Sequence, residues 1–89
     1  MVRRKRKTSP TRDLRAVRKQ LGLTLRDVYE RSLRIAEKRG RKEFVIPPSR
    51  LHEIERQGIV PSIFRFYTLA HIYKYSLPQV LSWYGIPKR

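Results

Sequence analysis

The side chains best suited to chemistry in this sequence are basic, and the chemistry they suggest is the binding of a polyanion. Lys and Arg number 22 among 89 residues, against 7 Asp and Glu, which gives a formal net charge of +15. A field of this sign and size attracts nucleic acid first and an anionic membrane surface second. The composition therefore points to a nucleic-acid partner.

The charge is concentrated at the start of the chain. Residues 1–12 carry no acidic side chain and six basic ones, among them Arg3, Arg4, Lys5, Arg6 and Lys7. This segment has almost no apolar side chain to bury. We expect a flexible basic N-terminal arm over residues 1–12 that contacts nucleic acid, and the alternative is a passive solvated tail.

Residues that could support catalysis or bind a metal are missing. The sequence has no Cys, and neither His52 nor His71 lies at metal-ligand spacing from a partner. The four Gly fall at the ends of predicted elements and form no phosphate-binding loop. We therefore expect no catalytic residue, no metal, no cofactor and no enzymatic activity.

The length of the chain allows one small domain, which we place at residues 13–86. It leaves no room for a separate sensor domain, so we expect no small-molecule effector. No apolar run approaches the roughly 18 residues of a membrane span, and no apolar segment follows the basic start as in a signal peptide. The expected location is the cytoplasm, in association with the nucleoid.

Helices must position the basic side chains, because no strand-like alternation of apolar and polar residues is sustained. The predicted helices cover about 11–21, 24–38 and 48–57, with a fourth after Ser62 and a fifth after Ser76. Thr24 with Asp27, and Ser76 with Gln79, have the spacing of a capping box. The expected fold class is an all-α domain of five helices.

The third predicted helix is polar over most of its surface. Leu51 and Ile54 face the core, while the remaining faces carry Ser49, Arg50, His52, Glu53 and Arg56. Before it, Phe44, Val45 and Ile46 are expected to anchor the connection to the body. Arg39, Arg41 and Lys42 then flank the helix and reach phosphates; the alternative is a tolerated surface insertion.

Apolar and aromatic residues crowd the C-terminal third of the chain. The expected buried stripe of the fourth helix consists of Ile63, Phe66, Leu69, Ala70 and Tyr73. Phe64, Trp83 and Tyr84 exceed what one small core can cover, which indicates self-association. We expect Trp83 and Tyr84, with the fifth helix, to form the surface of a homodimer.

The arrangement of five short helices with a polar third helix is that of a helix-turn-helix DNA reader. The runs LRAVRKQLGLTLRDVYERS and SRLHEIERQGIVPSIFRFYTLAHIYKYSLPQVL resemble the phage repressor/Cro-type helix-turn-helix family, also called the XRE family. The resemblance spans about residues 13–82 and depends on LGLT, IERQG, PS and SLPQVL occurring together. It implies a recognition helix in the major groove and a dimer on two half-sites.

The resemblance also assigns roles to positions. The base-reading positions are Pro48, Ser49, Arg50, His52 and Glu53. With the basic residues that flank the recognition helix, the expected phosphate contacts are Arg18, Arg26, Arg39, Arg41, Lys42, Arg56 and Gln57. A structural ion pair between Arg18 and Glu55 is expected to tie the first helix to the third.

The sequence departs from the family pattern in three places. Leu25 stands where the family commonly has a phosphate-binding Gln, and Arg26 is expected to substitute for it. Pro48 replaces a polar base-reading side chain and leaves only apolar contact, for example with a thymine methyl group. The connection between the second and third helices, with an insertion placed at 33–46, is much longer than the family's short turn.

Together these observations predict a sequence-specific double-stranded DNA-binding protein that regulates transcription, with no membrane partner. Three alternatives stay open: an architectural or weakly specific DNA-binding protein, an RNA-binding protein, and a partner-binding module of the antitoxin type.

Overall fold

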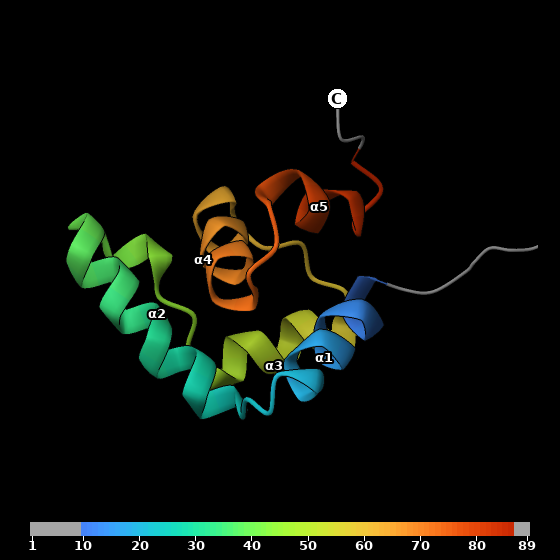
Figure 1. Ribbon diagram of the computed structural model, residues 1–89, viewed down its shortest axis with the longest axis horizontal. Helices are drawn as coiled ribbons and strands as arrows, with labels where there is room; N and C mark the ends of the chain where they lie inside the picture. The colour runs from blue at the N-terminus through green and yellow to red at the C-terminus, as the bar shows by residue number, and fades with distance from the viewer. Residues whose placement is uncertain (1–9, 87–89) are drawn as a thin grey trace, which may run out of the picture.

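The chain forms five α-helices in the computed structural model, which describes residues 10–86 (Figure 1). They are α1 (Pro10–Gln20), α2 (Leu25–Arg39), α3 (Pro48–Gln57), α4 (Ile63–Tyr73) and α5 (Leu77–Ser82), with a 3-10 turn η2 (Lys42–Phe44) between α2 and α3. The described residues include no β-strand, so the predicted all-α class with five helices is confirmed. Most of the predicted arm, including residues 3–7, lies outside the described part of the chain.

The helix starts follow the predicted caps. The Thr24 hydroxyl accepts a hydrogen bond from the Asp27 amide at 3.0 Å, and the Asp27 carboxylate accepts one from the Thr24 amide at 2.9 Å. The Ser76 and Gln79 pair repeats this arrangement at the start of α5. Both capping boxes are confirmed, and each satisfies amides that the first turn of a helix leaves without a partner.

The helix ends use left-handed backbone conformations. Gly40 after α2 and Gly58 after α3 have φ values of 72° and 71°. Lys74 ends α4 in the same conformation, with φ 64°, and donates its amide to the Ala70 carbonyl. A side chain in this conformation carries a steric cost that glycine avoids.

The core lies where α1, α2, α3 and α4 meet, and a smaller apolar cluster joins α4 to α5. Its fully buried apolar side chains include Leu14, Val28, Ile46, Leu51, Ile54, Leu69 and Val80. The expected burial of Ile63 is wrong, because 56% of this residue is exposed. Thr68 is buried instead, since its hydroxyl finds two carbonyl acceptors inside the protein.

Hydrogen bonds between its backbone and side chains of α2 and α4 hold the connection between α2 and α3 against the rest of the domain. The Ile46 amide donates to the Ser32 hydroxyl at 3.0 Å. The Thr68 hydroxyl donates to the Phe44 carbonyl at 2.7 Å, and the Arg65 Nε donates to the Val45 carbonyl at 2.9 Å. Three consecutive residues are thus held by side chains from α2 and α4, so residues 44–46 anchor this connection as predicted.

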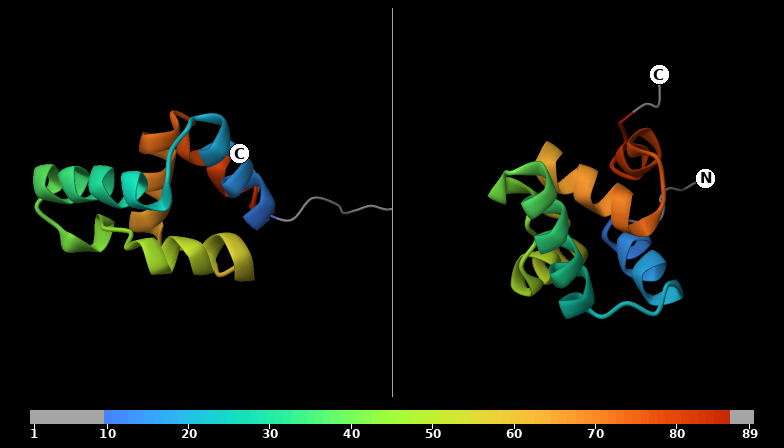
Figure 2. Two further views of the ribbon diagram at one scale, coloured as in Figure 1. Left: turned by 90° about the horizontal axis from the view of Figure 1, so that it is seen from below. Right: turned by 60° about the vertical axis from the view of Figure 1, so that its left-hand side comes forward.

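The connection and α3 share one side of the molecule. Figure 2 (left) shows η2 in line with α3 along one edge, and the C-terminal end of α4 toward the opposite edge.

None of the helices within residues 10–86 combines the length and the apolar character that crossing a bilayer requires.

Candidate nucleic-acid interface

The helix α3 has a buried side and a solvent-facing side. Leu51, Ile54 and Glu55 are buried. At 3.6 residues per turn, these positions fall within one arc of about 100°, and the polar side chains fill the remainder. The solvent-facing side carries exposed Ser49, Arg50, His52, Arg56 and Gln57, with Glu53 half-buried beside them. Four of the five base-reading candidates are thus gathered on this side, and Pro48 is half-buried at the helix start.

Arg50 and Glu53 form an ion pair across one turn of α3. The Arg50 Nη1 and a Glu53 carboxylate oxygen are 3.1 Å apart, and their side chains are 45% and 42% exposed. An exposed pair of this kind contributes about 0.2–1 kcal/mol. The Arg50 guanidinium can therefore exchange this carboxylate for another acceptor at little cost.

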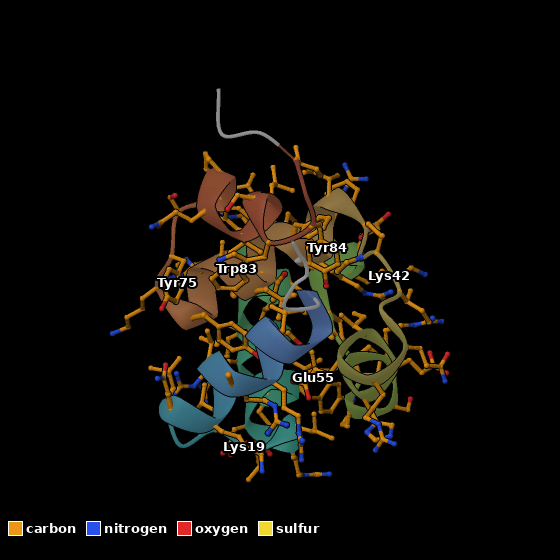
Figure 3. The ribbon with its side chains drawn as sticks, turned by 90° about the vertical axis from the view of Figure 1, so that its right-hand side faces the viewer. Lys19, Lys42, Glu55, Tyr75, Trp83 and Tyr84 are labelled. Carbon is orange, nitrogen blue, oxygen red and sulfur yellow. The ribbon has the colours of Figure 1, made fainter. Side chains whose placement is uncertain are left out.

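A buried ion pair ties α3 to α1. The Arg18 Nε and Nη2 donate to the two Glu55 carboxylate oxygens at 2.7 and 2.9 Å, and its Nη1 donates to the Leu23 carbonyl at 2.9 Å. The hydrogen bond to Glu55 raises the pKa of Arg18. Figure 3 shows Glu55 between the two helices. The contact fixes which side of α3 faces the core.

The expectation that Arg18 contacts phosphate is wrong. Its side chain is only 10% exposed, and the Nε, Nη1 and Nη2 atoms all donate to partners inside the protein. Reaching a phosphate would leave the Glu55 carboxylate buried without its partner, which is strongly unfavourable.

Two arginines beside η2 are held against aromatic rings of α4. The Arg41 guanidinium lies 4.6 Å from the centroid of Phe64 and 3.4 Å from a Glu43 carboxylate oxygen. The Arg39 guanidinium lies 5.3 Å from the centroid of Tyr67 and donates to its hydroxyl. Cation–π contact of this kind restricts where each guanidinium lies and leaves its charge in place.

Lys42 is the basic residue of η2 itself. It is exposed and has no ion-pair partner among the described residues. Figure 3 shows its side chain on the side of the molecule where α3 lies. Arg26 belongs to the first turn of α2 instead, where it is exposed and lies 3.5 Å from a Glu30 oxygen.

The two residues expected to form a dimer surface pack against their own chain. The rings of Tyr84 and Phe66 pack edge to face with their centroids 5.1 Å apart, and so do the rings of Trp83 and Tyr75, also at 5.1 Å. Both residues are half-buried against the core, and the Tyr84 hydroxyl is buried. The premise that the core cannot cover them is wrong, because both side chains pack against the two apolar clusters of the domain. Dimerisation itself stays a prediction.

Sequence reasoning missed the cluster of aromatic side chains that supports η2. The Phe44 ring packs in T-shaped geometry with the rings of Phe64 and Tyr67, with centroid distances of 5.2 and 5.4 Å, and Tyr67 stacks with His71. The signal was available, because Phe64, Tyr67 and His71 stand at i, i+3 and i+7 on α4 and so form a second stripe beside the buried one. Among the side chains of residues 14–86, no three His, Asp or Glu gather as metal ligands would.

Comparisons with protein-family models, curated proteins and solved structures gave no match to this chain. Its function must therefore be inferred from the arrangement of its own side chains.

Proposed function

We propose that the protein binds double-stranded DNA sequence-specifically through the solvent-facing side of α3 and thereby regulates transcription. The observation that supports this most strongly is the division of α3, whose apolar residues and Glu55 are buried while its other side offers donors and acceptors to solvent. A major groove admits an α-helix, and its base edges present distinct patterns of donors and acceptors.

Arg50 is the side chain best suited to read a base. A guanidinium donates two parallel hydrogen bonds to O6 and N7 of guanine, and the weak pair with Glu53 releases it readily. Ser49 and His52, both exposed on the same helix, add hydrogen-bonding groups nearby. Pro48 at the helix start offers only apolar contact.

Phosphate contacts would position this helix without reading the sequence. Lys42 and Arg56 are exposed on the elements that share one side of the molecule. Arg41 joins them with its guanidinium held over Phe64. Each phosphate neutralised releases counterions, so binding should weaken steeply as the salt concentration rises.

The test begins with selection of bound duplexes from a random pool, followed by fluorescence anisotropy titrations at one salt concentration. Arg50→Ala should cost about 1–3 kcal/mol on the selected duplex and relax the preference at one base pair. Lys42→Ala is the matched control, because it removes one positive charge beside α3. It should weaken binding to all duplexes equally and flatten the salt dependence.

Equal loss on every duplex with Arg50→Ala would refute its base-reading role. A pool without enrichment would favour weakly specific DNA binding, which the exposed basic residues of α1 and α2 also suit. Tighter binding to a structured RNA competitor than to any duplex would reject DNA as the partner.

A further inference from the structure

A second basic surface lies away from α3. The C-terminal half of α2 and the C-terminal end of α4 border an open groove of about 320 Å³. Its walls carry Arg31, Arg34 and Lys38 from α2, and Lys74 from the end of α4. All four are exposed. Figure 2 (left) shows the end of α4 on the edge opposite η2 and α3, so this groove is separate from the interface proposed for DNA.

In the part of the chain that the structure describes, no ion pair within 4.0 Å joins any of the four cations of the groove to a carboxylate. Ion pairs within the described residues join Arg18, Arg26, Arg41 and Arg50 to carboxylates, and none includes a cation of the groove. No Asp or Glu is among the groove-lining residues that the structure describes. Like charges gathered in one place repel one another, and a bound anion would remove that repulsion.

The positions of these cations in the fold place them on one continuous surface. Arg31, Arg34 and Lys38 stand at i, i+3 and i+7, so they share one side of α2. Lys74 ends α4 in the left-handed backbone conformation, and this conformation fixes the direction in which its side chain leaves the helix end. A neighbouring hollow includes Asp27 and Glu30 and also borders Arg31 and Arg34. The end of the groove nearest Lys38 and Lys74 is therefore the most positive.

The groove also has apolar residues. Ile72, which is only 4% exposed, and half-buried Ile35 line it between the charged side chains. Its volume is at the lower end of the range for small-molecule sites, about 300–1,000 Å³. A concave site of this size suits a compact ligand better than the convex surface of a duplex. Charged walls around an apolar patch suit a ligand with both a ring and several phosphates.

We propose that this groove binds an organic polyphosphate of the nucleoside triphosphate class. The phosphates contact Arg34, Lys38 and Lys74, and the ring lies against Ile35 and Ile72. The proposal does not depend on DNA binding, because no residue of α3 or η2 lines the groove.

The test is isothermal titration of the whole chain with ATP, with adenosine and with tripolyphosphate, at about 150 mM salt to screen long-range attraction. ATP should bind at one saturable site, and both fragments should bind more weakly. Arg34→Gln/Lys38→Gln should weaken ATP binding about tenfold or more, because it removes two charged hydrogen-bond donors. Arg15→Gln/Lys19→Gln is the matched control on α1, with the same loss of charge at two exposed positions.

Several results would overturn the proposal. If both double variants weaken ATP binding equally, the affinity depends only on the net charge of the protein and not on the groove. Tripolyphosphate binding as tightly as ATP would remove the role of the apolar patch. A groove variant that loses affinity for duplex and keeps its affinity for ATP would make the groove a nucleic-acid surface. Thermal unfolding confirms that both variants are folded, and NMR provides an independent readout. ATP should shift the signals of Ile35 and Ile72 in the unsubstituted protein, and unshifted signals would place ATP elsewhere.

Discussion

Glu55→Gln should destabilise the protein far more than the loss of an ordinary ion pair. The substitution preserves the volume of the side chain and removes its charge, which leaves the Arg18 guanidinium buried without a counter-charge. Glu55 is 5% exposed and accepts two hydrogen bonds from Arg18 at 2.7 and 2.9 Å. Breaking one side of a buried pair costs about 3–5 kcal/mol, against a total stability of about 5–15 kcal/mol for a domain.

Urea and thermal unfolding followed by far-UV circular dichroism measure this loss. For a domain of this size, about 3–5 kcal/mol corresponds to a fall in Tm of roughly 12–40 °C. Glu30→Gln is the matched control, because it breaks the exposed pair with Arg26, whose side chains are 75% and 51% exposed. That change should cost less than about 1 kcal/mol.

Removing both charges should undo most of the damage. Arg18→Met/Glu55→Leu replaces the pair with apolar side chains, and such replacements are often neutral or stabilising. The unpaired Leu23 carbonyl should leave a residual cost of about 1 kcal/mol. A loss with Glu55→Gln no larger than that with Glu30→Gln would contradict a buried role for the pair. So would a double variant that loses as much stability as Arg18→Met and Glu55→Leu lose together as single variants.

Three further variants probe other contacts. Tyr73→Phe should be neutral or stabilise by about 1 kcal/mol in urea unfolding, because the Tyr73 hydroxyl is buried without a partner among the described residues; a larger loss would contradict this. Thr68→Val should cost about 1–3 kcal/mol and speed hydrogen exchange at residues 44–46, since the Phe44 carbonyl loses its donor; unchanged exchange would show that this bond does not hold the connection. The backbone and hydroxyl of Thr24 hold the pKa of Asp27 below its ordinary value of 3.8. The capping box therefore stabilises the fold above that pH and loses its effect as the pH falls further, so the Tm advantage over Asp27→Asn should shrink in acid; a constant advantage would refute it.

Much of the fold could be predicted because the signals at helix ends are local. The Thr24 and Ser76 boxes depend on residues three apart, and Gly40 and Gly58 each depend on one backbone conformation. The turn η2 was missed because its three residues carry no periodicity. It is stabilised by contacts from α4, about 20 residues further along the chain.

The candidate interface was predicted less completely, because charge in the sequence does not reveal its partners. Arg18 and Arg50 are the same residue type, yet one is enclosed by Glu55 and Leu23 while the other is half-exposed. Only packing decides between these two roles. The groove next to Lys74 was missed for the same reason, since it requires α2 and the end of α4 to lie together.

The extended connection between α2 and α3 brings a constraint on how such a domain can change during evolution or design. Its last apolar residue, Ile46, is completely buried, and its amide satisfies the Ser32 hydroxyl. A deletion that restored a short turn would therefore leave a vacancy in the core and a hydroxyl without its donor. Shortening requires compensating substitutions on α2 and α4. Lengthening at exposed Arg41 or Lys42 adds little loop-closure entropy and gives up only the local hydrogen bonds of η2. In related sequences, insertions and deletions in this connection should therefore occur before Phe44 and be absent from residues 44–46.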